Sequence, residues 1–584
     1  MKHLIFLLVL FIIGYPTTYG QEQKTDFSQL QNLIPQEKVF IHYNSSLIFP
    51  GEYLYYKLYT LDLERNNLSN ISKIAYVEII DATGKSVIKQ KLNLIDGMGQ
   101  GDIFIPTALL SGNYKIVGYT KWMRNGGSDN YFSDNITIIN PYRNDQEAIL
   151  SKADTLIKSN PSGSRLKIDD VSNKYAINLS ERSSFGKREK ISFDLKSAEK
   201  LPLEGNFSIS VRRKDGLDLP NRITSKNFLA SYTSKNSISK NTFLPDLRGD
   251  LFSGRIIPKN GSKENLKPEK IAISVPDQEF SLRLSETDTN GNFKFILDRD
   301  NYGEEIFLEV IGEHRNDYNI EVDHASNFDF SNMKFEGLKI DEKMRNYILE
   351  RSVYNQIENS YYSAKPDTLK SDVNNMPFYG SNNVEIFKLE DYTRFKTVQE
   401  TFIEIITNAK IKEGKNKEVI FEVFPRDGAQ DFGDPALLLI DGVYIQDTNK
   451  LMEYDARNIE EIRVLRDKYY YGPKVFRGIV EIQTRNNDYL EGLDKDYIAK
   501  ESIIVPQQKK IYFKPNYAEG AIDSKRIPDF RTQLLWEPNL NLSANSLGKV
   551  EFYTSDVAGN YEIVMEGFTV NGEAVSLSKE FAVK

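Results

Sequence analysis

The stretch that most constrains the fold spans residues 435–484, where short apolar segments alternate with turn residues. Residues 437–440 and 479–482 are apolar except for Glu481. Each has the length and composition of a largely buried strand bounded by turn residues. A third apolar segment, at residues 459–465, lies between them. This arrangement predicts a small α+β unit with its own core.

The same stretch resembles the plug domain of TonB-dependent receptors. The pieces that carry the resemblance are, in order, Asp441-Gly442, residues 459–465, Tyr471-Gly472 and residues 478–484. The resemblance implies a compact domain over residues 385–490, with Leu438 and Val480 in buried strands. The Asp-Gly pair is best interpreted as a turn in which glycine accepts a positive φ. Fewer than a quarter of the residues follow this unit, so we expect a plug-like module without the barrel of a receptor.

The overall composition predicts a globular, strand-rich chain of several domains. Its 584 residues are 40% hydrophobic and 27% charged, and they include 33 tyrosines and 33 phenylalanines. The formal charge of −8 gives no basic footprint, so a nucleic-acid partner is not expected. Cysteine is absent, which excludes disulfides, thiol catalysis and a lipidated N-terminal cysteine.

Residues 1–20 have the pattern of a secretory signal peptide. A basic start precedes an apolar run at residues 4–13, and the small residues Thr18 and Gly20 come just before Gln21. No later segment reaches the roughly 20 apolar residues of a spanning helix. We therefore predict an exported mature chain without a transmembrane segment, in the periplasm or at the cell surface, peripherally associated with the outer membrane.

Short alternating strands separated by Gly, Pro, Asn and Asp turns predict serial β-sandwiches of macroglobulin or immunoglobulin-like type. The first covers residues 36–141, where residues 38–59 and 109–125 resemble the MG2 domain of the α2-macroglobulin family in exported Bacteroidota proteins. Residues 165–215 resemble the macroglobulin-type domain that follows it. Residues 505–584 are similar to the C-terminal module of such proteins, which predicts a separate closing sandwich.

Two further segments complete the predicted organisation. Residues 244–325 contain strands joined by an Asn-Gly turn and resemble the carboxypeptidase regulatory-like domain, a small transthyretin-like sandwich. Apolar residues at helical spacing over residues 338–363 follow Asp341, a candidate N-cap, and predict a tether helix. A second helix is expected over residues 391–407. The predicted fold class is mainly β, with serial sandwiches, one α+β plug-like domain and short tether helices.

Few residues of the sequence are candidates for catalysis. His42 sits in an expected strand and favours a structural role, while His314 and His324 flank a charged stretch without the tight spacing of metal ligands. No hydrolase, nucleotide-binding or zinc-protease motif is present. The thioester of trapping macroglobulins requires cysteine, so covalent trapping is excluded. We predict that the chain is not an enzyme and needs no cofactor or metal.

Three adjacent tyrosines, at residues 469–471, cannot all enter one small core, so at least one ring should lie near the surface. The predicted partner-binding surface consists of Tyr469, Tyr470, Tyr471, Arg466, Lys468, Lys474 and Arg477. The alternative is that the rings pack on neighbouring sandwiches of the same chain. Trp122 with Tyr119, and Trp536 with Phe530, fit core aromatics better than sugar-stacking platforms.

These features favour a non-enzymatic structural or interaction subunit of an outer-membrane complex, serving protein assembly, secretion or SusC-type uptake. Its expected partner is an outer-membrane barrel protein or an accessory subunit of one. A noncovalent macroglobulin-like protease-binding protein is the second hypothesis, although no bait-like flexible segment is evident. A glycan-active enzyme is the third, and it would require two carboxylates brought together from distant strands.

Overall fold

The computed structural model shows a mainly β chain, as the sequence predicts. It describes residues 34–584 apart from 151–173, 180–181, 198–202, 218, 220, 233–242, 260, 262–265, 277–280, 298–302, 324–329, 371–377, 381–382, 415–417, 427–433, 473, 494, 519–525 and 544–547. The predicted signal peptide lies outside the described residues. Within the described part, no helix is long and apolar enough to cross a lipid bilayer.

The first sandwich consists of two sheets from the N-terminal third of the described chain. One sheet has the order β1 (Glu37–Tyr43), β3 (Tyr53–Asp62), β6 (Met98–Phe104). The other has the order β2 (Leu47–Ile48), β8 (Phe132–Ile138), β7 (Gly112–Thr120), β4 (Ile74–Ile80), β5 (Ser86–Asn93). Val39 and Ile41 of β1 face β7, where Gly118 leaves room for them. Alternation along β1 therefore places one set of side chains between the sheets.

The second sandwich combines two segments that the sequence predicts as separate domains. One sheet has the order β10 (Ser184–Phe185), β34 (Ala574–Val583), β33 (Gly559–Thr569), β12 (Gly205–Arg213), β31 (Gln533–Leu542). The other is β32 (Val550–Tyr553), β11 (Lys190–Ser197), β9 (Tyr175–Leu179). Because β12 pairs with β31 and β33, the segments expected at 165–215 and 505–584 share one core. The structure thus differs from the prediction of two independent sandwiches.

The first and second sandwiches pack tightly on each other. Phe40 on the outer side of β1 contacts Phe568 of β33, with ring centroids 5.8 Å apart. His42 is buried there, and its Nδ1 lies 2.7 Å from the hydroxyl of Ser208 on β12. Burial is the main cause that lowers the pKa of His42 well below its ordinary value. This histidine occupies a structural position between the two sandwiches.

The third sandwich forms mostly from the segment expected to be transthyretin-like. One sheet has the order β16 (Asn292–Leu297), β13 (Asp250–Pro258), β18 (Tyr318–Val322). The other is β15 (Ser281–Glu286), β14 (Lys270–Val275), β17 (Glu305–Ile311), β29 (Ile498–Ser502). Strand β29 comes from about 190 residues further along the chain and was not anticipated. It completes the sheet by pairing with β17.

The α+β module follows in residues 378–493. Its sheet has the order β20 (Val384–Lys388), β25 (Ile459–Leu465), β28 (Ile479–Thr484), β23 (Leu437–Ile440), β24 (Val443–Tyr444). Helices α4 (Val398–Glu404) and α5 (Asn449–Glu453) share a core with one face, which also contains Leu438 and Val480. The prediction that both residues lie in buried strands is confirmed. Helix α4 is shorter than expected because Thr397 and Glu400 form a capping box at its start.

The opposite face of the module's sheet packs on the third sandwich. Leu437 and Leu439 belong to one buried cluster with Ala272 and Leu282 of the sandwich. Two hairpins accompany the module, β21 (Ala409–Glu413) with β22 (Val419–Val423) and β26 (Tyr469–Tyr471) with β27 (Lys474–Phe476). This face of the module's sheet is therefore covered within the chain.

A buried carboxyl lies at this interface. Gln446 of the module donates a hydrogen bond of 2.6 Å to Glu309 of β17. Burial raises the pKa of Glu309 to about 8, which Gln446 and Arg315 only partly counteract. The ordinary value is near 4.5, so the folded chain binds this proton more tightly than the unfolded chain does.

We expect the stability of this interface to fall as pH rises from about 4.5 to about 8, at no more than ~1.4 kcal/mol per pH unit. The Glu309→Gln variant should lose this dependence and exceed the parent in stability above pH 8. The pH dependence is measured by hydrogen exchange of peptides from β17 and β24. Exchange is followed from pH 5 to pH 9 and corrected for the intrinsic rate. Glu305→Gln is the control, because Glu305 lies on the same strand but is half-exposed and pairs with Lys500. Parallel pH profiles for the parent and Glu309→Gln would contradict the assignment.

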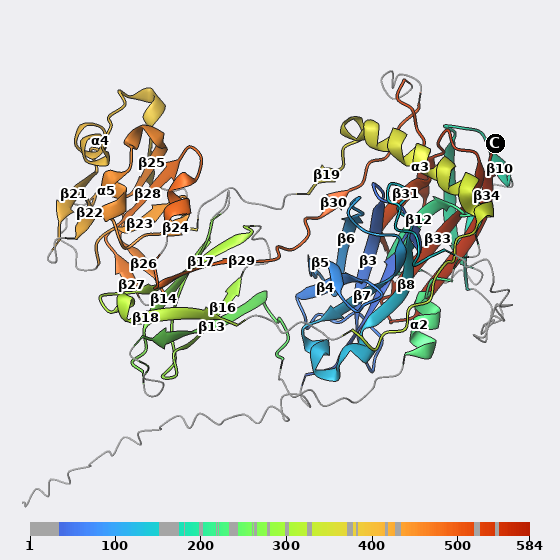
Figure 1. Cartoon of the computed structure of the whole chain (residues 1–584), viewed down its shortest axis with the longest axis horizontal. Coiled ribbons are helices and arrows are strands. Elements are labelled where there is room, and N and C mark those ends of the chain that lie inside the picture. The colour runs from blue at the N-terminus through green and yellow to red at the C-terminus, as the bar shows by residue number, and fades with distance from the viewer. Residues whose placement is uncertain are drawn as a thin grey trace, which may run out of the picture.

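The described modules form two bodies connected by repeated crossings of the chain. The first two sandwiches, α2 (Ser225–Ser231) and α3 (Arg345–Ser360) form one body, and the third sandwich with the α+β module forms the other (Figure 1). The chain passes between them from α2 to β13, from β18 to α3, from β19 (Thr368–Leu369) to β20, and from β29 to β30 (Lys510–Ile511). Helix α3 falls in the predicted tether segment, after Asp341, whose side chain accepts a hydrogen bond from Lys343 N–H.

Candidate functional site

The structure divides the three predicted tyrosines between the interior and the surface. Tyr469 and Tyr471 stack on each other and contact Phe378, and the hydroxyl of Tyr471 donates to the carbonyl of Leu282 in the third sandwich. Tyr470 points away and is 70% exposed. At least one ring therefore lies at the surface, as predicted. The other two pack within the chain, which is the alternative considered for them.

The four predicted rim cations lie around this hairpin and form bonds within the module. Arg466 donates to the carbonyl of Phe424 at 2.7 Å. Lys474 pairs with the carboxylate of Asp434 at 3.1 Å, and Arg477 donates to the carbonyl of the same residue. Lys468 lies over the ring of Tyr470 at 5.8 Å. Of the seven residues of the predicted surface, Tyr470 is exposed and the other six are partly buried.

The other residues singled out by sequence have clear positions. His314 is exposed on a 3-10 turn, 3.7 Å from Asp317, and His324 lies outside the described residues. No group of three or more metal-ligating side chains occurs among the residues that the structure describes. Asp441 has a positive φ and its carboxylate accepts two hydrogen bonds from Thr484, which supports the turn interpretation.

A pocket that the sequence did not reveal opens in the body made by the first two sandwiches and α3. It encloses about 1030 Å³, including its open mouth. Its lining comes from residues 44–55, Arg212, residues 351–367, residues 512–513 and residues 530–536. Strands, a helix end and two extended segments from across the chain therefore form its wall together.

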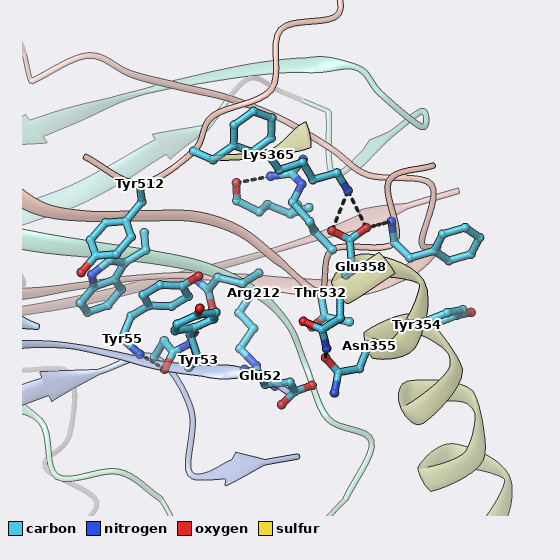
Figure 2. Close-up of a pocket in the computed structure, with 18 of the residues that line it drawn as sticks. Glu52, Tyr53, Tyr55, Arg212, Tyr354, Asn355, Glu358, Lys365, Tyr512 and Thr532 are labelled. Atoms are coloured by element: carbon cyan, nitrogen blue, oxygen red, sulfur yellow. Dashed lines mark hydrogen bonds and ion pairs between the residues drawn. The ribbon is translucent and has the colours of Figure 1, made fainter. Parts of the chain in front are cut away.

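Figure 2 shows how the side chains lie. Tyr55, Tyr53 and Arg212 follow one another along one side of the pocket, with Glu358 and Lys365 across from them. Lys365 donates to Glu358 at 2.7 Å, and Glu358 also accepts from the backbone N–H of Phe530. This charge pair joins the end of α3 to the segment that precedes β31.

Arg351 at the base of the pocket is fully bonded. It donates to both oxygens of Glu52, at 2.9 and 2.7 Å, and to Asp215 at 2.6 Å. It also donates to the carbonyl of Leu47 and lies over the ring of Phe49. Burial is the largest single effect and opposes ionisation of Asp215, but Arg351, Arg212 and the hydroxyl of Tyr347 together outweigh it and hold the pKa of that carboxyl below its usual range. The guanidinium thus connects α3 to both sandwiches.

Among the described residues, Arg212, unlike Arg351, lacks hydrogen-bond acceptors for part of its guanidinium. Its Nε and Nη2 atoms are buried, and no described residue accepts a hydrogen bond from them. The nearest carboxylate, that of Asp215, is 3.8 Å away. Burial and then the charge of Arg351 lower the pKa of Arg212. A buried guanidinium without acceptors is costly, but these two atoms have almost no accessible surface, so a ligand in the pocket does not reach them.

Other polar groups on the wall are free within the described part of the chain. The hydroxyls of Tyr55 and Thr532 have no hydrogen-bond partner there, and neither has Oδ2 of Asp367. The second oxygen of Asp367 accepts from the backbone N–H of Phe513 at 2.9 Å. Burial raises the pKa of Asp367. Donors and acceptors therefore remain available on both sides of the pocket.

Aromatic rings form the other part of the wall. Tyr53 stacks on Tyr55 with centroids 5.8 Å apart and on Tyr362 at 6.3 Å. Tyr55 in turn contacts Tyr512 edge-on at 4.9 Å and Trp536 at 6.1 Å. Trp536 is itself a buried core residue, as predicted, yet it supports the aromatic wall from behind.

Local sequence patterns could not have located this pocket, because its wall combines residues up to almost 500 positions apart. The one available signal was the charge of Arg212, which directly follows the core residue Val211 near the end of β12. Strand alternation places it on the face opposite Val211. What covers that face depends on long-range packing.

No family model and no curated protein sequence matches the chain. Among solved structures, an α2-macroglobulin of Escherichia coli activated by porcine elastase matches with 8% identity and a TM-score of 0.24, over 94% of this chain and 44% of that one. A Salmonella α2-macroglobulin variant matches with 9% identity and a TM-score of 0.23, over 94% and 39%.

The chain therefore spans less than half the length of these neighbours. Bacterial α2-macroglobulins are among its structural neighbours at low similarity. The resemblance to the carboxypeptidase regulatory-like and receptor plug domains stays a prediction, as does an origin in Bacteroidota.

Proposed function

We propose that the chain is a non-enzymatic, exported interaction subunit of an outer-membrane-associated complex, and that its α+β module contacts a barrel protein or an accessory subunit. The observation that carries the proposal is Tyr470. It extends from a hairpin whose neighbouring rings, Tyr469 and Tyr471, pack against the core, so a large aromatic side chain is presented at the surface. Rigid, amphipathic tyrosines suit protein contacts because binding orders little additional structure.

The connection between modules also supports a scaffold role. Four chain crossings join the two bodies, so neither body is a simple appendage of the other. Lys121 of the first sandwich donates to the carbonyl of Leu251 in β13 at 3.1 Å, which adds a contact at one crossing.

The Tyr470→Ser variant tests the proposal. We expect its unfolding free energy to stay within about 0.5 kcal/mol of the parent, because the side chain is exposed. Co-purification of an outer-membrane barrel protein from gently solubilised envelopes, identified by mass spectrometry, should fall several-fold. Tyr392→Ser, an exposed tyrosine of the same module, is the matched control and should retain the partner.

Two results would count against the proposal. One is a parent chain that copurifies no barrel protein or barrel-associated subunit. The other is a Tyr470→Ser variant that retains its partner as fully as Tyr392→Ser does. A copurifying protease would instead favour the macroglobulin-like hypothesis.

A further inference from the structure

The pocket between the first two sandwiches and α3 has internally neutralised charges. Arg351 is bonded to Glu52 and Asp215, and Lys365 to Glu358. Arg531, which also lines the pocket, is paired with Asp529 at 2.7 Å. Arg212 lies 3.8 Å from Asp215 and belongs to the Arg351 network, in which two cations face two carboxylates. Asp367 is the remaining charge on the wall. One carboxylate opposes an anionic ligand and gives a strongly cationic one little counter-charge.

The hydrogen-bonding groups of the wall that have no partner suit a polar, uncharged ligand. Asp367 offers an acceptor, and the hydroxyls of Tyr55 and Thr532 can act as donor or acceptor. A purely apolar ligand would strip water from these groups and return no hydrogen bond. The ligand must therefore carry many groups that both donate and accept.

The aromatic wall adds a second requirement. Tyr53, Tyr55 and Tyr362 form a stacked series, and Tyr362 is 48% exposed at the mouth. Aromatic faces attract flat, weakly polarised C–H surfaces. A pyranose ring has such a face, and its hydroxyls project around the edge as combined donors and acceptors.

An extended peptide fits this wall less well. Recognition of a peptide strand uses free backbone N–H and C=O groups, but those of the wall are occupied. The N–H of Tyr55 donates to Asn44 Oδ1 at 3.1 Å, and the carbonyl of Tyr55 accepts from Asn44 N at 3.0 Å. The carbonyl of Tyr53 accepts from the Asn44 side-chain amide.

We infer that this pocket is a binding site for a neutral oligosaccharide, with sugar rings stacked on Tyr53, Tyr55 and Tyr362 and hydroxyls bonded to Asp367 and Thr532. It is a second site, in a different body from the hairpin that carries Tyr470. The two proposals are independent, since either could fail while the other holds.

The test is isothermal titration of the purified chain with neutral tetra- to hexasaccharides, namely α- and β-linked glucans, mannans and xylans. At least one should bind saturably. Two variants locate the site: Tyr362→Ala removes a ring at the mouth, and Thr532→Val removes a hydroxyl that has no partner within the described chain. Each should weaken binding by roughly five- to tenfold, the usual magnitude for one aromatic or hydrogen-bonding contact.

Tyr361→Ala is the matched control, because Tyr361 is adjacent, 40% exposed and not part of the lining. It should bind like the parent, and all three variants should keep the parent's melting temperature within a few degrees. The inference is overturned if no neutral sugar of the panel binds, if only uronic-acid oligomers bind, or if Tyr362→Ala and Thr532→Val bind like the parent. Saturable binding of an unstructured peptide that depends on both residues, without sugar binding, would reassign the pocket to peptides.

Discussion

Replacing Arg351 with methionine is expected to destabilise the body formed by the first two sandwiches by about 3–5 kcal/mol, the usual cost of removing one partner from a buried ion pair. The guanidinium is 2% exposed and bonds Glu52, Asp215 and the carbonyl of Leu47. Methionine fills much of the volume but leaves two carboxylates without their cation. The loss is therefore electrostatic more than steric.

The pH dependence gives this prediction a second readout. Arg351 and Arg212 hold the pKa of Asp215 below its usual range, against the opposing effect of burial. A depressed carboxyl pKa contributes stability that is complete above the ordinary value and disappears as pH falls through the native value. The gap between the parent and Arg351→Met should thus be largest near pH 7 and smaller near pH 3.

Urea unfolding followed by tryptophan fluorescence measures the effect, since Trp122 and Trp536 both lie in this body. Arg345→Met, an exposed arginine of the same helix, should change the unfolding free energy by less than about 0.5 kcal/mol. Adding Glu52→Gln and Asp215→Asn to Arg351→Met should recover part of the loss. Equal midpoints for the parent and Arg351→Met would show that the ion-pair network does not hold α3 in place.

Local sequence patterns predicted the structure correctly where it depends on residues that are close together in the chain. The alternation of strand residues, the turn at Asp441 and the apolar segments around Leu438 and Val480 all report interactions within a few residues or one module. The tyrosine triplet is a similar case. In a strand, Tyr469 and Tyr471 share one face and Tyr470 takes the other, which is what the hairpin shows.

Pairing between distant segments carries no such local signal. Strand β12 and strand β31 have ordinary strand patterns, and nothing in either specifies the other as its partner. Closing a loop of more than 300 residues between them is only slightly more costly than closing a short one, because the entropy grows with the logarithm of length. Because the strand patterns do not specify which distant strands pair, they predicted two small sandwiches where the structure has one.

The pocket shows the same limit for a functional site. Tyr53 and Tyr55 lie on a strand that reads as an ordinary half-buried one, and Phe530 and Trp536 suit a core. Only the packing of α3 over both sandwiches turns these residues into a wall. The charged residue Arg212 was visible in the sequence, but its lack of acceptors appears only once its surroundings are known.

Replacing Leu438 with aspartate should unfold the α+β module. Leu438 is 3% exposed, pairs in register with Val480 of β28 and belongs to the core shared with α4 and α5. The substitution removes an apolar side chain and places an unpaired carboxylate in that core, which together cost roughly 5 kcal/mol. That is comparable to the entire stability of a small domain.

The change should remain local, since the module and the first two sandwiches have separate cores. Hydrogen exchange should show loss of protection in β23 and β28, whereas the tryptophan-detected transition of the other body stays near its parent midpoint. Ile403→Asp is the matched control in the same module, because Ile403 on α4 is 70% exposed. Parent-like protection of β23 in Leu438→Asp would mean that this strand is not buried. Simultaneous loss of both transitions would instead show that the four chain crossings make the two bodies one cooperative unit.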